Sequence, residues 1–231
     1  MSWYWYFLVV MMGIAVSVVY RYTVLSFYRA YPKDPHFYQN KTYQRSYHHL
    51  FCSALFFLYI LVYIIFAYLS IIPNIGIKHY IALPFAFFLT IIACVDCKLY
   101  LIPFWCLVGV LIIGGLYHLG QVLFIDTEVS LIDLMYIGFQ EKIPFFIGIG
   151  VLYWLVLRNR IGLGDIYFLM ILLILFSVEV WLYAVLLACL LGILFACILK
   201  IVKKSIGYIA FGPWIALSTW LMFLVVLDGK I

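Results

Sequence analysis

The sequence predicts an all-α fold, a polytopic transmembrane helical bundle of about eight spans with its N-terminus outside. Three observations predict it: the composition, the length of the apolar runs and the distribution of basic residues. Of the 231 residues, 69% are hydrophobic and only 10% are charged, and the mean hydropathy is +1.20. Soluble domains are about half apolar and a quarter charged, so most of the surface of this chain must face lipid.

Apolar runs of spanning length alternate with charged segments or segments that contain Pro or Gly. The division near Ser177 rests on Glu179, because a lone carboxylate in mid-membrane is costly. Residues 121–142 are predicted to form a long external connection. The predicted spans are 3–20, 51–72, 80–96, 101–120, 143–157, 164–178, 180–199 and 209–227.

The distribution of Lys and Arg predicts the orientation. With the N-terminus outside, 11 of the 14 basic residues fall on the cytoplasmic side, in agreement with the positive-inside rule. The three exceptions are Lys78, Lys142 and Lys230. The net charge of +5 comes without a basic arm or stripe, so no nucleic-acid partner is predicted.

Three acidic residues fall on the cytoplasmic side: Asp34, Asp96 and Asp165. Asp34 lies in a polar loop, whereas Asp96 ends one predicted span and Asp165 opens another at the same membrane surface. Two neighbouring carboxylates can hydrolyse a peptide without a covalent intermediate. The ionised one takes a proton from water, and the protonated one hydrogen-bonds the scissile carbonyl.

The local sequence predicts different roles for the two carboxylates. Asp165 is predicted as a helix N-cap, where backbone amides favour the ionised form. Asp96, near a helix C-terminus, is predicted to carry the proton more often. Gly162 and Gly164 allow backbone conformations closed to other residues and are predicted to let a substrate strand approach closely.

Three short motifs follow one another between residues 90 and 227. They are Asp96 with Ile102-Pro103 six and seven residues later, Gly162-Leu163-Gly164-Asp165, and Phe211-Gly212-Pro213. Together they resemble the motifs of the type IV prepilin peptidases, and the Gly-x-Gly-Asp signature is shared with presenilin-like intramembrane aspartyl proteases. In this family the Phe-Gly-Pro segment opens the last span.

The resemblance implies an aspartyl endopeptidase of the bacterial cytoplasmic (inner) membrane with its active site facing the cytoplasm. Its partners would be the lipid bilayer and a prepilin or pseudopilin, from which it would remove the basic leader after a Gly. Asp96 and Asp165 match the catalytic positions. A single membrane domain is predicted over 1–231, with the first span and a short basic loop in 1–50 and the catalytic core in 80–227.

The chain departs from the family pattern in its cysteines. Many members carry two zinc-binding Cys-x-x-Cys pairs after the first span, but no such pair occurs between Arg21 and Leu50. We therefore predict no metal, and no cofactor for the peptidase. Such members also methylate the new N-terminus, and S-adenosylmethionine would be required here if that activity is retained. Residues 13–32 resemble the family's N-terminal motif only loosely.

Several alternatives stay open from the sequence. Asp96 and Asp165 could be interfacial charges that merely end two helices, or ion- or proton-relay groups of a small transporter. The chain could also be an inactive scaffold of a pilus or secretion machine. For Phe211-Gly212-Pro213 the favoured role is to shape a helix entry, because Pro suits a first helical turn.

Overall fold

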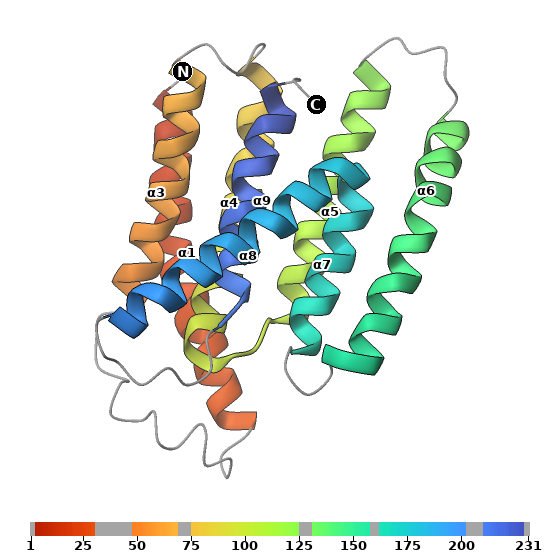
Figure 1. The fold of residues 1–231 in the computed structure, drawn as a ribbon. Helices are drawn as coiled ribbons and strands as arrows, with labels where there is room; N and C mark the ends of the chain where they lie inside the picture. Colours follow the sequence, from red (N-terminus) through yellow and green to blue (C-terminus); the bar gives the residue numbers. More distant parts are fainter. Residues whose placement is uncertain are drawn as a thin grey trace.

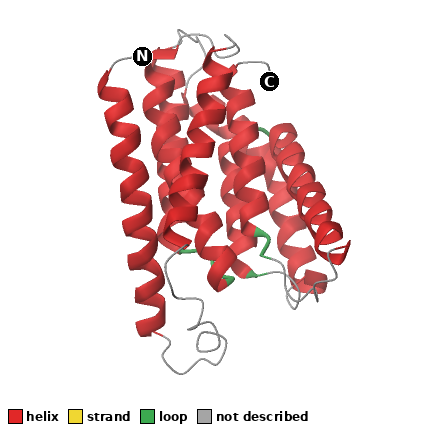
Figure 2. Ribbon diagram, turned by 90° about the vertical axis from the view of Figure 1, so that its left-hand side faces the viewer, coloured by secondary structure: helices red, strands yellow, loops and turns green. Residues whose placement is uncertain are grey.

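A computed structural model of the chain describes residues 3–30, 48–68, 75–124, 131–157, 162–201 and 210–228. Within these ranges it contains eight α-helices and no strand, which confirms the all-α prediction. Figure 2 shows these helices standing roughly side by side. They are α1 (Trp3–Ala30), α3 (His48–Tyr68), α4 (Ile75–Leu99), α5 (Phe104–Phe124), α6 (Leu131–Leu152, continued by the π-helical η2, Tyr153–Leu157), α7 (Leu163–Leu175), α8 (Val178–Ile201) and α9 (Gly212–Asp228).

Each predicted span coincides with one helix, but several helices extend beyond their apolar run. α1 continues to Ala30, and α6 begins at Leu131. The prediction of a long connection over 121–142 is therefore wrong, because α5 and α6 occupy most of it. The reason is that Glu141 and Lys142 interrupt the apolar run without interrupting the backbone hydrogen bonds of the helix. Part of the evidence for the orientation lies outside the described residues. This part comprises the basic residues between 31 and 47, together with Arg158 and Arg160.

The predicted division near Ser177 is confirmed. α7 ends where the N–H of Phe176 donates to the carbonyl of Leu172 at 2.9 Å. The hydroxyl of Ser177 accepts a hydrogen bond from the N–H of Val180 at 3.4 Å, as an N-cap residue does. α8 therefore begins at once, and Glu179 lies exposed in its first turn.

The bundle is arranged around α4 (Figure 1). α4 packs against α1, α3, α5 and α9, and 67% of its apolar stretch is buried, against 17% for α8. α8 runs obliquely across the other helices and packs against α9 and α7. The core between α3, α4 and α9 is aromatic: Tyr59 stacks on Trp220 at 5.6 Å and Phe85 on Phe223 at 4.4 Å between ring centroids.

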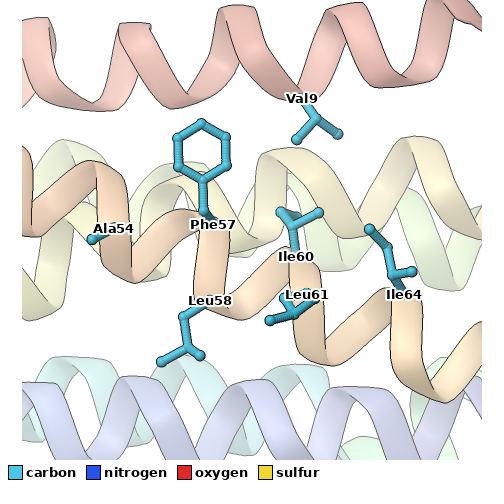
Figure 3. A pocket seen from close by; sticks show the side chains of 7 residues that line it. All are labelled: Val9, Ala54, Phe57, Leu58, Ile60, Leu61 and Ile64. Carbon is cyan, nitrogen blue, oxygen red and sulfur yellow. The ribbon is translucent and has the colours of Figure 1, made fainter.

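In the described part of the chain, three helices are long and apolar enough to cross a membrane by themselves. These stretches are Phe7–Phe27, Ile81–Leu99 and Val178–Ile198. Shorter apolar stretches occur in α3, α5, α7 and α9. A shallow apolar recess of about 430 Å³ lies between α1 and α3 and is lined by Val9, Ala54, Phe57, Leu58, Ile60, Leu61 and Ile64 (Figure 3). No lining residue can ionise, so the recess is a packing feature and not a site of chemistry.

The topology brings the motif-bearing ends of the helices together. The start of α1 and the end of α9 lie at one end of the bundle, as Figure 1 shows. The end of α4 and the starts of α5, α7 and α9 lie at the other end. Asp96, Asp165 and Gly212 are therefore at the same end, as the sequence predicts for the two carboxylates. Which end faces the cytoplasm stays a prediction.

Candidate active site

Asp96 lies in the last turn of α4 and is 4% exposed. Its own carbonyl accepts a hydrogen bond from the N–H of Tyr100 at 2.9 Å. Tyr100 has a φ of 54°, a left-handed conformation that ends many helices but is uncommon for a residue other than Gly. The chain therefore turns away directly after α4, and the carboxylate of Asp96 stays inside the bundle.

The carboxylate of Asp96 is held by the start of α9. The backbone N–H of Gly212 donates to Oδ2 of Asp96 at 2.9 Å. Gly212 is the first residue of α9, where backbone N–H groups have no partner within the helix and the helix dipole attracts negative charge. A Cβ atom on Gly212 would stand 2.7 Å from Oδ2, so any side chain at this position would displace the carboxylate of Asp96.

The rest of the Phe211-Gly212-Pro213 motif forms the entry to α9. The carbonyl of Phe211 accepts hydrogen bonds from the N–H groups of Trp214 and Ile215 at 3.0 and 3.2 Å. The role in helix entry that the sequence favours is thus present. The contact with Asp96 is an additional role that the sequence analysis missed. The only sequence signal for it is a Gly placed where the first amide of a helix is free to donate.

Asp165 lies in the first turn of α7 and is partly buried. The prediction that it is the N-cap is wrong. Gly162 takes that position, and its carbonyl accepts hydrogen bonds from the N–H groups of Asp165 and Ile166 at 3.2 and 3.4 Å. The reason is that Leu163 and Gly164 are already helical. The Oδ1 atom of Asp165 is buried and has no hydrogen-bond partner among the described residues.

The two glycines before Asp165 do not use the conformational freedom that glycine allows. Gly162 has a φ of −65° and a ψ of 143°, which any residue can adopt. Gly164 packs tightly, because a Cβ atom there would stand 3.0 Å from Cβ of Ile102. This contact joins the first turn of α7 to the segment that follows Asp96.

Ile102 and Pro103 form the connection between α4 and α5. The carbonyl of Pro103 accepts hydrogen bonds from the N–H groups of Cys106 and Leu107 at 3.0 and 3.4 Å and so begins α5. Ile102, half-buried, contacts Gly164. The motif residue six positions after Asp96 therefore contacts the first turn of α7, which carries Asp165, and the next residue begins α5.

The structure thus brings Asp96 and Asp165 close enough to interact electrostatically. They come from α4 and α7, with the first amide of α9 as a third component. Cys94, two residues before Asp96, is buried within hydrogen-bonding reach of the Cys52 thiol, whereas Cys97 is exposed, and all six cysteines are free. Fold and site together define a helical membrane protein with a buried pair of carboxylates at one end of its bundle.

The family of the chain follows from a comparison with known families. Residues 83–197 match the model of the type IV leader peptidase family, and this segment includes both Asp96 and Asp165. This segment belongs to the type IV leader peptidase family, and the family predicted from the motifs is confirmed. The match implies a leader-peptidase-like protease of a membrane. No curated protein and no solved structure matches the chain.

Proposed function

We propose that the chain is an aspartyl endopeptidase that removes the basic leader of type IV prepilins or pseudopilins, with Asp96 and Asp165 as its catalytic pair. The observation that carries the proposal is a pair of interacting carboxylates from α4 and α7, of which Asp96 also accepts a hydrogen bond from the first amide of α9. The family supplies the reaction class, proteolysis. The substrate class is inferred from the motifs that resemble prepilin peptidases.

The geometry supports a water-mediated hydrolysis. Two carboxylates at close range share one proton, because both cannot be ionised without strong repulsion. The ionised member takes a proton from water as that water attacks the scissile carbonyl, and the protonated member hydrogen-bonds the carbonyl oxygen. The tetrahedral intermediate then collapses as a proton passes to the leaving amine.

The surroundings of each carboxylate support a division of roles. Oδ1 of Asp165 has no partner among the described residues, so it can accept the proton of the attacking water. Oδ2 of Asp96 is occupied by the Gly212 amide, which leaves Oδ1 of Asp96 for the contact with the substrate carbonyl. In this assignment Asp165 is the general base, in agreement with the hypothesis from the sequence.

The proposed location is the bacterial cytoplasmic membrane, with the carboxylates at the cytoplasmic face. Support comes from the distribution of Lys and Arg and from the position of both carboxylates at one end of the bundle. The same position is unfavourable for a transporter, whose charged groups lie near the midplane. The proposed partners are the lipid bilayer and the pilin-like substrate. Peptide hydrolysis by this pair needs no metal or organic cofactor, and S-adenosylmethionine would serve a retained N-methylation.

The test is cleavage of a co-expressed prepilin in cells that lack their own peptidase, followed by gel shift and N-terminal mass. We expect loss of the leader with the wild-type chain and none with Asp96→Asn or Asp165→Asn. Glu179→Gln is the matched control, because Glu179 is an exposed carboxylate in the first turn of α8. Cleavage by either Asp variant would overturn the catalytic assignment. An uncut partner prepilin despite normal expression would overturn the function.

A further inference from the structure

The C-terminal end of α7 receives polar side chains from two neighbouring helices. Nζ of Lys142, on α6, donates to the carbonyl of Ile174 at 2.9 Å. Nε2 of His118, on α5, makes a short hydrogen bond to the carbonyl of Leu175. Both carbonyls belong to the last turn of α7, where backbone acceptors have no partner within the helix. His118 and Lys142 therefore cap α7 from outside.

These caps lie at a point where α5 and α7 pack tightly. Gly114, one turn before His118, is so close to α7 that a Cβ atom would stand 2.5 Å from Cδ2 of Leu175. A third donor contacts the middle of the helix: Nε1 of Trp181, on α8, donates to the carbonyl of Leu169 at 2.9 Å. Three different helices thus hold α7 through its backbone carbonyls.

α7 is short, and its opposite end carries Asp165. The helix has 13 residues, and Asp165 is in its first turn. An α-helix of this length is a stiff rod of about 20 Å, so a shift of its last turn along the axis moves its first turn equally. At the first turn the axial position is limited by packing of Gly164 against Ile102. At the last turn the axial position of α7 is limited by the caps from His118 and Lys142.

We propose that His118 and Lys142 are positioning residues for Asp165: by capping the last turn of α7 they fix its axial position and hence the separation of the two carboxylates. The inference rests on the proposed function, because its effect is on the geometry of the Asp96–Asp165 pair. Removal of a cap leaves a carbonyl of the last turn without its side-chain donor, so α7 shifts or its last turn unwinds. A positively charged Lys142 also interacts favourably with the C-terminal end of the helix dipole.

The test compares the purified wild-type chain with His118→Phe and Lys142→Met in a prepilin cleavage assay over a range of pH. We expect kcat to fall about 10- to 100-fold with KM nearly unchanged, because small displacements of catalytic groups have effects of this size. We also expect the two limbs of the pH–rate profile to move closer together, since a larger separation weakens the coupling of the carboxylates. Lys142→Arg keeps a donor and should restore kcat.

Lys200→Met is the matched control, because Lys200 is an exposed lysine in the last turn of α8. A role of the caps in stability alone predicts lower protein yield or Tm with unchanged kcat and an unchanged pH profile, and that result would overturn the inference. If Lys142→Met does not accumulate, His118→Phe tests the same positioning role, because it removes the cap that α5 supplies. An inactive wild-type chain would overturn the proposed function itself, whereas fully active cap variants beside an active wild type overturn the positioning role only.

Discussion

Gly212 and Asp96 are 116 residues apart in the sequence, yet the backbone N–H of Gly212 donates to Oδ2 of Asp96 at 2.9 Å. This hydrogen bond joins the first residue of α9 to the last turn of α4. It fixes one oxygen of the carboxylate and leaves the other for chemistry. The Phe-Gly-Pro segment is thereby part of the candidate site as well as a helix entry.

Replacement of Gly212 by Ala tests this relationship. The added Cβ atom would stand 2.7 Å from Oδ2 and 3.0 Å from Cγ of Asp96, so the carboxylate must move. We expect the cleavage rate to fall about 100-fold or more while the protein still accumulates in the membrane. Gly192→Ala is the control, because its Cβ would meet Trp214 and Phe211 of the same region at ordinary distances of 3.6 and 3.7 Å. Equal activity of the two variants would contradict the prediction.

The two glycines before Asp165 should respond differently to the same change. At Gly162 the backbone suits any residue, and a Cβ atom would stand 3.6 Å from Oδ2 of Asp165. At Gly164 a Cβ atom would stand 3.0 Å from Cβ of Ile102 and would push α7 away from the segment after Asp96. We expect Gly162→Ala to keep most of the activity and Gly164→Ala to lose about 10-fold or more, measured as initial rates of leader cleavage. The reverse order would refute the packing role of Gly164.

The two carboxylates should act as one unit. Asp96→Asn and Asp165→Asn each remove the shared proton chemistry, so the double variant should be no less active than the worse single variant. The measurement is the residual cleavage rate of all three at equal protein level. If the fold-reduction in cleavage rate of the double variant equals the product of the two single fold-reductions, the carboxylates act independently.

Hydropathy and motif spacing predict the helices and the carboxylate pair, because both depend on local sequence. The division between α7 and α8 follows from Glu179 and is confirmed, since a charged residue and a turn coincide there. The start of α6 at Leu131 was missed, because an apolar run measures the part of a helix that faces lipid and not its hydrogen-bonded length. Likewise Asp165 is the third residue of α7 and not its N-cap, because Gly162 takes the N-cap position.

The contacts that complete the site could not be predicted from one sequence. The Gly212–Asp96 hydrogen bond depends on how α9 packs against α4, and no local pattern encodes that pairing. From the sequence, Lys142 is predicted only as an outside charge, and His118 lies within an apolar run. Their role as caps of α7 appears only when α5, α6 and α7 lie together. Such contacts between distant segments are where the structure adds most.

Removal of metal ions should leave cleavage unchanged. The proposed reaction uses the proton shared by Asp96 and Asp165, and no metal-held water takes part in it. We expect the purified chain to cut a prepilin at the same rate with and without excess EDTA. A loss of activity that added Zn²⁺ restores would contradict this prediction.

The orientation predicted from the basic residues can be measured by labelling single cysteines. Glu179, in the first turn of α8 directly after α7, and Leu163, in the first turn of α7, are both exposed and lie at opposite ends of α7. In a cysteine-free chain, a membrane-impermeant maleimide should label Glu179→Cys in intact cells. It should label Leu163→Cys only after the cells are made permeable, because the carboxylate end is predicted to face the cytoplasm. Val16, fully buried in α1, supplies a Val16→Cys control that stays unlabelled in both conditions. The opposite pattern would place the carboxylates outside, where a prepilin leader held in the cytoplasm cannot reach them.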